Sequence, residues 1–494
     1  MHRIPRGSLA ALIALALGAA LTAAVTGGNP SGGRGTGTPA PAEAARAASG
    51  TFSKRVVAAC LGDPHEIVRA PDGALWGTEK SGRKVTRVDP ASGAKPTLLG
   101  LPQAVHGEGG QDGVLGMAVE RREDGGAYAY IAYSYDIDPA PAVRARTRIE
   151  RCTHDAGRER LHSPKAVIAG MPSGNDHQSA RLRPGPDGKL YHTIGDQGVN
   201  RFGDFCRSSY AVRLPTAHEV EGRDRTAYRG KTLRLNTDGS VPADNPVLDG
   251  VRSHVHTYGH RNARGLAFGP DGTLHSNEQG PKTDDEINIL RGGADYGWPD
   301  VSGHRDDKAY VYADWSASWP TPCDEPTLSD FEIPASVPVQ RESDFTGPFV
   351  RPIHTFGAVG SNFDFQDPRC ARGERWSVCR PTIAPSSSEH YGTSRKSADA
   401  TGEGLPGRDD SLVMTILEDG TVYRIDLAPD GQDVSGITEL ITEENRFRDT
   451  EFSADGMSLF VATDSAGPVR DERGAPSTGP LENPGAIIEY RFQG

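Results

Sequence analysis

The sequence predicts an all-β fold, a β-propeller of repeated antiparallel sheets, on three observations. First, the 494 residues include 60 Gly and 37 Pro and are only 36% hydrophobic, a composition that suits many short strands joined by turns. Second, a pattern recurs in which an apolar segment meets an Asp-Gly turn and a second apolar segment follows. Third, further apolar strands separate these hairpins, so that sheets of three or four strands repeat along the chain, as they do in propellers.

The hairpins can be placed in order along the chain. They occupy residues 66–79, 181–196, 266–275 and 451–461, and each has Asp-Gly at its turn. Asp and Gly supply the backbone conformations that a short hairpin turn needs. Third strands are predicted over residues 231–235 and 422–427. A pair of β-sandwiches or another all-β array remains the alternative, because the irregular spacing does not determine the number of sheets.

The first 49 residues have a different character. Arg3 and Arg6 precede an apolar run from Leu9 to Val25, and small residues follow it, which is the pattern of a secretory signal peptide. A membrane anchor is the weaker alternative, because the run is rich in Ala and lies at the lower edge of spanning length. We therefore expect residues 1–49 to be a signal peptide and a Gly-, Pro- and Ala-rich linker, and residues 50–494 to form the propeller. The mature protein is expected to be extracellular or periplasmic, with no stable membrane span.

The net charge and the absence of certain motifs exclude several classes of binding partner. A formal net charge of −12 argues against binding to nucleic acid or to an anionic membrane, since both require a basic surface. The sequence has no Walker-type phosphate loop, no strand-linked Gly-x-Gly-x-x-Gly and no Gly-x-Ser-x-Gly elbow, so nucleotide cofactors and α/β-hydrolase chemistry have no support. A small molecule is the expected partner.

If the protein is exported, its six cysteines are expected to form disulfides, because thiols of secreted proteins usually pair. Cys370 and Cys379 are close enough in sequence to close a small loop, and we expect a disulfide between them. The other four permit three connectivities, and nothing in the sequence chooses among them; they are Cys60, Cys152, Cys206 and Cys323.

Polar residues stand just ahead of the first strand of each hairpin. They are His65, His177 with Gln178, Arg261 with Asn262, and Arg446 with Arg448, and Gln111 with Asp112 stands ahead of the apolar run 114–118. If these first strands are the innermost ones, the polar residues gather at one mouth of the central channel. Such a mouth suits an anionic ligand and a proton transfer.

His177 is the candidate general base at this mouth. The ordinary pKa of a histidine, about 6.5, suits proton abstraction near neutral pH, and Asp176 or Asp196 could orient the ring. Arg261 and the pair Arg446 and Arg448 could hold carboxylates through forked hydrogen bonds. Taken singly, a histidine is more often structural and an arginine is more often solvated surface.

Acidic residues concentrate in one further region. The segment 280–286 contains three acids, and Asp306, Asp307 and Glu342 follow. Calcium is the natural ion for carboxylates and backbone carbonyls in irregular loops. The alternative is a run of solvated acids, since no EF-hand spacing is present.

Several long motifs then carry a resemblance to a known family. They include Gly110-Gln111-Asp112-Gly113, Asn175-Asp176-His177-Gln178-Ser179, Gly259-His260-Arg261-Asn262, Asn277-Glu278-Gln279-Gly280-Pro281, Asp295-Tyr296-Gly297-Trp298-Pro299 and Asn445-Arg446-Phe447-Arg448-Asp449. From about Thr51 to Gly494 the chain resembles the soluble quinoprotein glucose dehydrogenases, in the glucose/sorbosone dehydrogenase family. The resemblance implies a six-bladed propeller of four-stranded antiparallel blades, a pyrroloquinoline quinone (PQQ) cofactor with calcium, and oxidation of an aldose to its lactone by hydride transfer to the quinone.

The resemblance also implies a role for each matching residue. His177 would take the proton of the anomeric hydroxyl, Asp196 would support it, and Arg261 would act on the reacting quinone oxygens together with Asn262. Gln111 and Asp176 would contact the sugar, Gln111 also lying against the cofactor, whose carboxylates Arg446 and Arg448 would hold. The carbonyls of Gly280 and Pro281 would bind the calcium of the cofactor. A second calcium would take the carbonyls of Ser302 and His304 and the carboxylates of Asp306 and Glu342.

Three positions depart from the family pattern. Glu418 stands where the family has a cofactor-binding lysine, and a carboxylate about 4 Å from a cofactor carboxylate would repel it by roughly 4 kcal/mol at an effective dielectric of 20. Arg201 replaces a glutamine, and Ser377 (or Trp376) and Arg380 replace an aromatic pair beside the disulfide. The two arginines are the candidates for compensating Glu418, and the lost aromatics are expected to alter substrate choice.

Two hypotheses of different classes follow. The first is a secreted PQQ- and calcium-dependent sugar dehydrogenase that uses a separate electron acceptor. The second is an extracellular propeller that has lost cofactor binding and serves as a binding module, which Glu418 and Arg380 favour. A hydrolytic propeller such as a lactonase is a more distant third. Whether two chains form a homodimer stays open.

Overall fold

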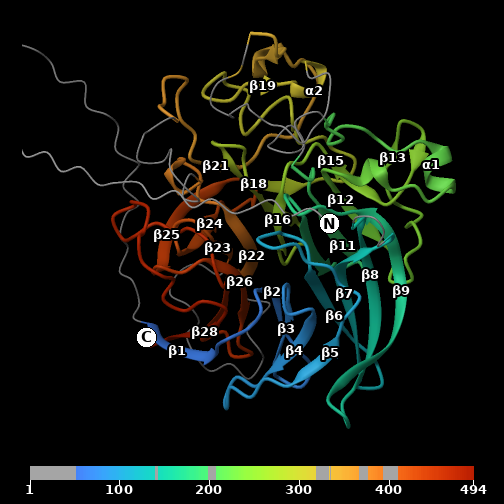
Figure 1. The fold of residues 1–494 in the computed structure, drawn as a ribbon, viewed down its shortest axis with the longest axis vertical. Coiled ribbons are helices and arrows are strands. Elements are labelled where there is room, and N and C mark those ends of the chain that lie inside the picture. The colour runs from blue at the N-terminus through green and yellow to red at the C-terminus, as the bar shows by residue number, and fades with distance from the viewer. Residues whose placement is uncertain are drawn as a thin grey trace, which may run out of the picture. The chain divides into compact units, whose positions relative to one another are not determined.

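Six four-stranded antiparallel sheets account for most of the strands in the part of the chain that the structure describes. The structure is a computed structural model and describes residues 52–138, 143–198, 207–318, 333, 335–365, 377–392 and 410–493. The six sheets are the blades of a β-propeller, as predicted, and Figure 1 shows them following one another from blue to red. The predicted leader, residues 1–49, lies outside the described residues.

Each blade is a meander whose first strand is innermost. From the inside outward, blade 1 has β2 (Pro64–Arg69), β3 (Leu75–Glu79), β4 (Lys84–Val88) and β5 (Thr97–Gly100); blade 2 has β6 (Val114–Arg121), β7 (Ala127–Asp136), β8 (Ala145–Asp155) and β9 (Arg160–Pro172); blade 3 has β10 (Ser179–Pro184), β11 (Leu190–Ile194), β12 (Lys231–Leu235) and β15 (Val255–Tyr258). Blade 4 has β16 (Ala263–Phe268), β17 (Leu274–Glu278), β18 (Asp285–Leu290) and β21 (His354–Phe356); blade 5 has β22 (Pro385–Gly392), β23 (Asp410–Ile416), β24 (Thr421–Leu427) and β25 (Val434–Thr442); blade 6 has β26 (Phe447–Phe452), β27 (Ser458–Thr463), β28 (Ile487–Phe492) and β1 (Phe52–Ala58).

The remaining described elements are short. They are the paired strands β13 (Val247–Leu248) and β14 (Val251–Arg252), the paired strands β19 (Tyr312–Ala313) and β20 (Val339–Gln340), the helices α1 (Ala217–Glu221) and α2 (Trp315–Ser318), and single 3-10 turns at Thr226–Tyr228, Glu342–Asp344 and Ser377–Cys379. No helix within the described ranges has the length and apolarity that crossing a membrane requires.

The inner strands form a closed ring. Strands β2, β6, β10, β16, β22 and β26 each contact the next in this order, and β26 contacts β2. The ring is fastened by β1, which pairs antiparallel with β28 from Phe52 opposite Phe492 to Ala58 opposite Ile487, and Figure 1 shows blue β1 beside red β28. Because the N-terminal strand completes the last blade, the two ends of the chain hold the propeller together.

The predicted hairpins are present at the predicted turns. In each, the glycine after the turn aspartate has a positive φ, for example +82° at Gly73 and +87° at Gly272. The aspartate side chain accepts a hydrogen bond from the backbone two residues on, as Asp72 does from Ala74 (3.1 Å). These local hydrogen bonds explain why Asp-Gly closes the turns. The predicted third strands over 231–235 and 422–427 are β12 and β24, each third in its blade.

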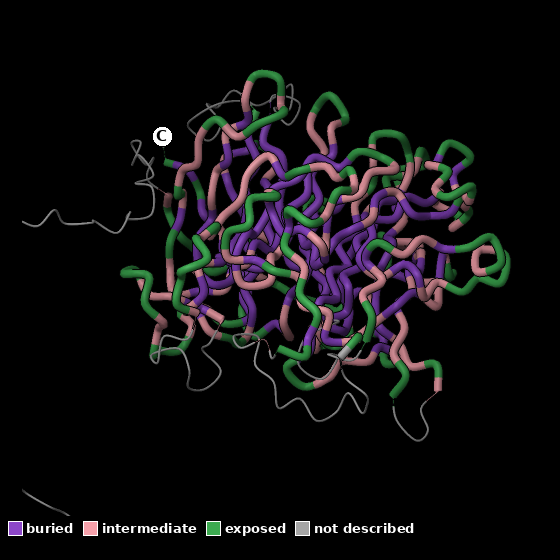
Figure 2. The backbone as a smooth tube through the Cα atoms, turned by 90° about the horizontal axis from the view of Figure 1, so that it is seen from above, coloured by how far each residue is buried: buried purple, intermediate pink, exposed green. Residues whose placement is uncertain are grey.

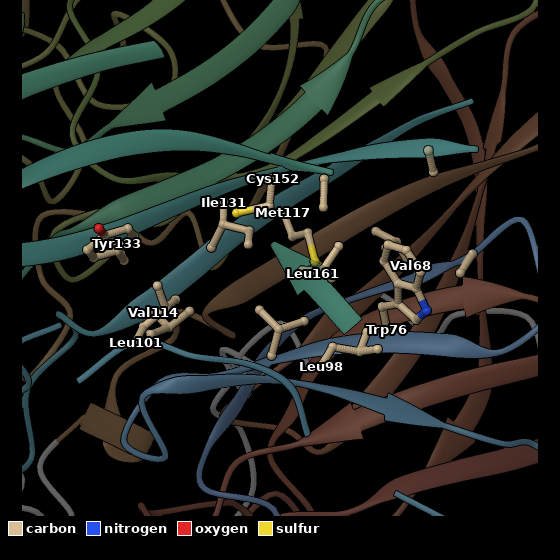
Figure 3. Packing of buried hydrophobic residues seen from close by; sticks show 14 of the residues in the cluster. Val68, Trp76, Leu98, Leu101, Val114, Met117, Ile131, Tyr133, Cys152 and Leu161 are labelled. Carbon is tan, nitrogen blue, oxygen red and sulfur yellow. The ribbon is translucent and has the colours of Figure 1, made fainter. Parts of the chain in front are cut away.

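The hydrophobic core is divided among the six junctions between blades. Between blades 1 and 2, Val68 and Trp76 pack against Met117, Ile131 and Cys152 (Figure 3). Each of the other junctions has a buried apolar cluster of its own. The buried backbone accordingly runs through the interior, whereas the loops are exposed (Figure 2).

A buried arginine ties the inner strands together. Arg181 on β10 is 1% exposed and forms ion pairs with Glu66 (3.1 Å) and Asp449 (2.9 Å). Its guanidinium also donates to the carbonyls of Arg264 and Ser386, both at 2.9 Å. Residues from five blades therefore meet at the Arg181 side chain.

The expectation that the exported thiols pair is wrong for two cysteines. Cys60 and Cys152 are free, and Cys152 lies in the core between blades 1 and 2, where burial raises the pKa of its thiol to about 12. A sealed thiol of this kind behaves as a small apolar side chain. Cys379 is disulfide-bonded, but its predicted partner Cys370 lies outside the described residues, as do Cys206 and Cys323.

Candidate active site

Every inner strand carries a β-bulge near its beginning. The pairing register shifts between Pro64 and Ile67, Val114 and Met117, Ser179 and Leu182, Ala263 and Gly265, Pro385 and Ser387, and Phe447 and Asp449. A bulge leaves residues unpaired and redirects their side chains. Since the six inner strands begin at the same mouth of the ring, the bulges and the residues just before them can direct polar side chains into it.

His177 and Asp196 form a buried pair at this mouth. The Nδ1 atom of His177 lies 2.6 Å from Oδ1 of Asp196, and the two side chains are 3% and 0% exposed. The same carboxylate accepts hydrogen bonds from the Gly198 amide (2.8 Å) and from Nε1 of Trp298 (2.9 Å). With Nδ1–H donated to the carboxylate, the lone pair of the imidazole is on Nε2, which is the form a general base requires.

The backbone around His177 explains how the pair is held. His177 has a φ of +40°, an uncommon conformation for a residue with a side chain. A Cβ atom on Gly195 would lie 1.8 Å from the carbonyl oxygen of His177. Only glycine therefore permits the close approach of the two segments that places Asp196 beside the ring.

Arg261 and Asn262 are fixed by the end of the neighbouring strand β17. Both of their backbone amides donate to the Glu278 carboxylate. The Arg261 guanidinium donates to the carbonyl of Gln279 (2.8 Å) and lies 5.6 Å from the Trp298 ring. The Asn262 amide donates to Oε1 of Gln279 (3.0 Å).

His177, Arg261 and Trp298 line one open pocket. Its lining joins His177, Arg261 and Pro281 to aromatic side chains, which are Trp298, Tyr310, Tyr312 and Trp315. A base, a cation, a backbone carbonyl and flat aromatic faces in one concave site suit a polar ring-shaped ligand.

A second group of polar residues continues the mouth toward blade 6. Gln111 donates to Asp176 (2.8 Å) and accepts from Arg264 (3.1 Å). Arg448 grips Asp464 with two hydrogen bonds, at 2.7 and 2.6 Å. Burial alone would raise the pKa of Asp464, but the neighbouring arginines hold it well below its usual range.

Arg446 belongs to the same group, because its Nε donates to Asp464 at 3.3 Å. Hydrogen bonds connect Gln111 to Asp176, Asp176 to His177, His177 to Asp196, and Asp196 to Arg261, the residue next to Asn262. Arg446 and Arg448 lie on the Asp464 side. The predicted position of the polar residues at one mouth therefore follows from the inner placement of the first strands.

The loop that would carry the first calcium is tightly folded. A Cβ atom on Gly280 would lie 2.0 Å from the carbonyl oxygen of Thr283, and the Gly280 amide donates to Asp285 (2.7 Å). The Pro281 carbonyl accepts a hydrogen bond from Nη1 of Arg380 at 2.9 Å. The guanidinium takes one of the two lone pairs of this carbonyl oxygen and would repel a calcium ion bound there, so the position of Arg380 opposes calcium binding.

The second predicted calcium set also contains buried carboxylate. Glu342 accepts hydrogen bonds from the amides of Ser302 (3.0 Å), Asp306 (3.3 Å) and Asp307 (3.0 Å). Burial and then the nearby Asp306 raise the pKa of Glu342 to about 7, a repulsion that a cation would relieve. In the described ranges no three His, Cys, Asp or Glu side chains converge as metal ligands, so a cation would depend on carbonyl oxygens such as those predicted at Ser302 and His304.

Glu418 and Arg380, two of the positions that depart from the family pattern, do not pair with each other as a compensating charge would. Glu418 is buried, and Oε2 of this residue lies 3.9 Å from the Arg470 guanidinium. Arg470 also forms an ion pair with Asp419 and donates to the Thr382 carbonyl (2.7 Å). Arg470 therefore faces Glu418, whereas Arg380 donates to Pro281. Arg201 and Trp376 lie outside the described residues.

Several residues of the site were missed by the sequence reasoning although a signal existed. In four blades an acidic residue lies at the end of the second strand or within two residues after it. Each of these acids accepts a hydrogen bond from a residue near the start of the first strand of the same blade. These acids are Glu79, Asp196, Glu278 and Asp464, of which only Asp196 was singled out. Trp298 lay inside a quoted motif, and its indole role became visible only in space.

Comparisons with known proteins agree with the fold and identify the family. The family profile "Glucose / Sorbosone dehydrogenase" matches residues 61–318. Quinoprotein glucose dehydrogenase B of Acinetobacter calcoaceticus is 39% identical over 457 residues, 92% of this chain and 94% of that protein. The aldose sugar dehydrogenase of Escherichia coli is 29% identical over 51% of this chain and 63% of that protein.

Among solved structures, the PQQ-bound aldose sugar dehydrogenase of Streptomyces coelicolor superposes with a TM-score of 0.57 at 24% identity, covering 90% of this chain and 99% of that one. That likeness supports the propeller fold. The profile match and the nearly full-length relative, taken with the motifs at the channel mouth, establish that this chain belongs to the glucose/sorbosone dehydrogenase family.

Proposed function

We propose that this protein is a quinoprotein dehydrogenase that oxidises an aldose at its anomeric carbon, with PQQ as cofactor. The observation that carries the proposal is the buried His177–Asp196 pair, 2.6 Å apart, beside a pocket that also contains Arg261 and Trp298. The kinship with quinoprotein glucose dehydrogenase B supports the same chemistry. The quinone, when bound, supplies the acceptor for the hydride that leaves the sugar, and the lactone is the expected product.

The residues of the chain divide the remaining work. Nε2 of His177 takes the proton of the anomeric hydroxyl, and Asp196 stabilises the imidazolium through the hydrogen bond to Nδ1. Gln111 and Asp176, already bonded to each other at 2.8 Å, bind sugar hydroxyls. Trp298 and the neighbouring aromatic side chains line the same pocket, where they would pack against the faces of a ring-shaped ligand.

The cofactor is a tricarboxylate, and basic residues suit it. Arg261 and Asn262 would bind the reacting quinone oxygens, Gln111 would lie against the cofactor, and Arg446 and Arg448 would hold carboxylates by charge-assisted hydrogen bonds. Calcium would bind at the Gly280 and Pro281 carbonyls, and a second ion would bind with Ser302, His304, Asp306 and Glu342. The signal-peptide pattern supports work outside the cytoplasm, with electrons passing to a separate acceptor.

The test is reconstitution of the purified chain. Calcium and PQQ are added while the quinone absorbance is followed, and reduction of an artificial acceptor is then measured with a panel of aldoses. His177→Ala should lower kcat by about 10²–10⁴, whereas His218→Ala, at an exposed position of α1, should leave it unchanged. Saturable quinone uptake without turnover of any aldose would contradict the proposal.

One observation favours a second candidate, a propeller without cofactor. Arg380 donates to the Pro281 carbonyl at 2.9 Å, where the resemblance places calcium. If that contact persists, the protein is an extracellular binding module. The same titration separates the candidates, because a binding module shows no saturable, calcium-dependent quinone uptake.

A further inference from the structure

Bulges on inner strands hold three further basic residues besides Arg181. His65 lies in the bulge of β2, Arg264 in that of β16 and Arg448 in that of β26, strands that are labelled near the centre of Figure 1. All three residues are nearly buried, at 3%, 4% and 6% exposed. Equivalent bulges thus place three nitrogen-rich side chains at one level of the ring.

Arg264 differs in its partners from Arg181, another buried arginine of the inner strands. Arg181 is neutralised by two carboxylates, at 3.1 and 2.9 Å. Arg264 donates to the neutral Oε1 of Gln111 at 3.1 Å, and it forms no ion pair with any residue in the described ranges. A buried guanidinium without a counter-charge is costly, which points to a missing anion.

Two residues near Arg264 each have one buried nitrogen without a hydrogen-bond partner. The Asp464 carboxylate occupies Nε and Nη2 of Arg448, and Nη1 of Arg448 and Nδ1 of His65 have no hydrogen-bond partner. Lys80, whose side chain passes close to Gly113, likewise forms no ion pair with a described residue.

The electrostatics agree with these unfilled contacts. Burial and then the guanidinium groups of Arg448 and Arg181 lower the pKa of Arg264 well below its usual range, although Asp464 and Asp176 oppose the shift. Burial and the cations of Arg181, Arg264, Arg448 and Lys80 also lower the pKa of His65. The field at this point of the mouth is therefore positive.

We propose that Lys80, Arg264 and Arg448, with the imidazole of His65, form an oxyanion site that holds a carboxylate at the channel mouth. Forked guanidinium donors match a carboxylate, and the unused donors of Arg448 and His65 supply further hydrogen bonds. The carboxylate can come from the cofactor, in which case the inference rests on the proposed function, or from a free oxyanion of the same chemistry. Arg264 and Lys80 would then supply the positive charge that the cofactor-binding lysine supplies in the family and that Glu418 lacks.

The experiment has two arms. In the first, the apo-protein is heated in millimolar sulfate or in sodium chloride of equal ionic strength. Sulfate should raise Tm saturably by about 2 °C or more in the native sequence, and Arg264→Gln should abolish the rise. Arg183→Gln is the matched control, because Arg183 is an inner-strand arginine already paired with Glu389 at 2.6 Å.

In the second arm, PQQ is titrated by absorbance. Arg264→Gln should weaken its affinity about tenfold or more, and Arg264→Lys should recover part of the loss. A sulfate effect alone identifies a free oxyanion as the occupant, and a PQQ effect alone identifies the cofactor carboxylate. Equal responses of the native protein and Arg264→Gln in both arms overturn the site.

Failure of the proposed function is distinguishable from failure of this inference. A chain that takes up no PQQ defeats the proposed function, while the sulfate arm still decides the oxyanion site. If Arg264→Gln does not fold, the sulfate response of the native protein and of Arg264→Lys decides the question. A native protein that shows no specific sulfate response and binds PQQ as tightly as its Arg264→Lys variant contradicts the inference.

Discussion

Replacing Asp196 by asparagine tests the chemistry of the site, because the two oxygens of this carboxylate serve three donors. Oδ1 accepts from Nδ1 of His177 at 2.6 Å and from the Gly198 amide at 2.8 Å, and Oδ2 accepts from Nε1 of Trp298 at 2.9 Å. An asparagine offers one oxygen and one NH₂ group. In Asp196→Asn the NH₂ group must therefore face an N–H donor, either on the His177 side or on the Trp298 side.

The magnitude depends on which side carries the NH₂ group. If it faces His177, Nδ1 must become the acceptor and the proton moves to Nε2, so the base is lost and kcat falls by about 10²–10⁴, or roughly 3–5 kcal/mol in the barrier. If it faces Trp298, the imidazolium that forms on His177 donates to a neutral amide oxygen and not to a carboxylate, and the lost charge-assisted hydrogen bond is worth about 1.5–3 kcal/mol. Either orientation predicts a loss of tenfold or more.

The assay is reduction of an artificial acceptor at saturating PQQ, calcium and aldose, so that kcat is read apart from cofactor affinity. Asp187→Asn is the control within the same blade, since Asp187 lies at the hairpin turn and pairs with Arg234 (2.8 Å). The reasoning is refuted if folded Asp196→Asn retains a kcat within about threefold of the native value, because no arrangement of the amide preserves all three contacts.

Three further predictions concern stability and the metal. Arg181→Met should lower the free energy of unfolding by about 3–5 kcal/mol, because it leaves the buried carboxylates of Glu66 and Asp449 without their cation. A decrease of less than about 1 kcal/mol, measured by urea denaturation, would contradict this. Burial lowers the pKa of His192 to about 4, below the value of about 6.5 in the unfolded chain. Between these values the unfolded chain binds more protons, so stability falls on acidification by up to about 1.4 kcal/mol per pH unit for this residue. His192→Gln should flatten that dependence of the urea midpoint, and unchanged slopes would count against it. Arg380→Gln should lower the calcium concentration for half-maximal PQQ uptake about tenfold, because it removes a cation from the Pro281 carbonyl. An unchanged calcium concentration would show that Arg380 does not oppose calcium at this carbonyl.

The blades were predictable because their turns are local. An Asp-Gly pair needs only a positive φ at glycine and a hydrogen bond two residues away, as at Asp72 and Gly73, and both are written in adjacent residues. The inner position of the first strands was only a condition of the predicted mouth, and the ring of contacts between these strands meets it. The sequence also carried the acids that end the second strands, but their partners are visible only when the blade is folded.

The charge pairs were not predictable in this way. Asp449 lies 268 residues from Arg181 yet pairs with it, and Glu418 faces Arg470 rather than the arginines nearest to the family pattern. The two free cysteines make the same point, because Cys152 is sealed in an interblade core that only the neighbouring blade completes. Such contacts depend on which blades meet.

The sequence by itself determined the all-β repeat, the hairpin turns and the polar residues that begin the inner strands, because these depend on conformational preferences within a few residues. The tertiary structure alone decided which of those polar residues share partners: His177 with Asp196 and Trp298, Arg448 with Asp464, and Arg264 with no carboxylate among the described residues. The physical reason is that pairing depends on distance in space, which for residues on different blades is set only when β1 joins β28 and the ring closes.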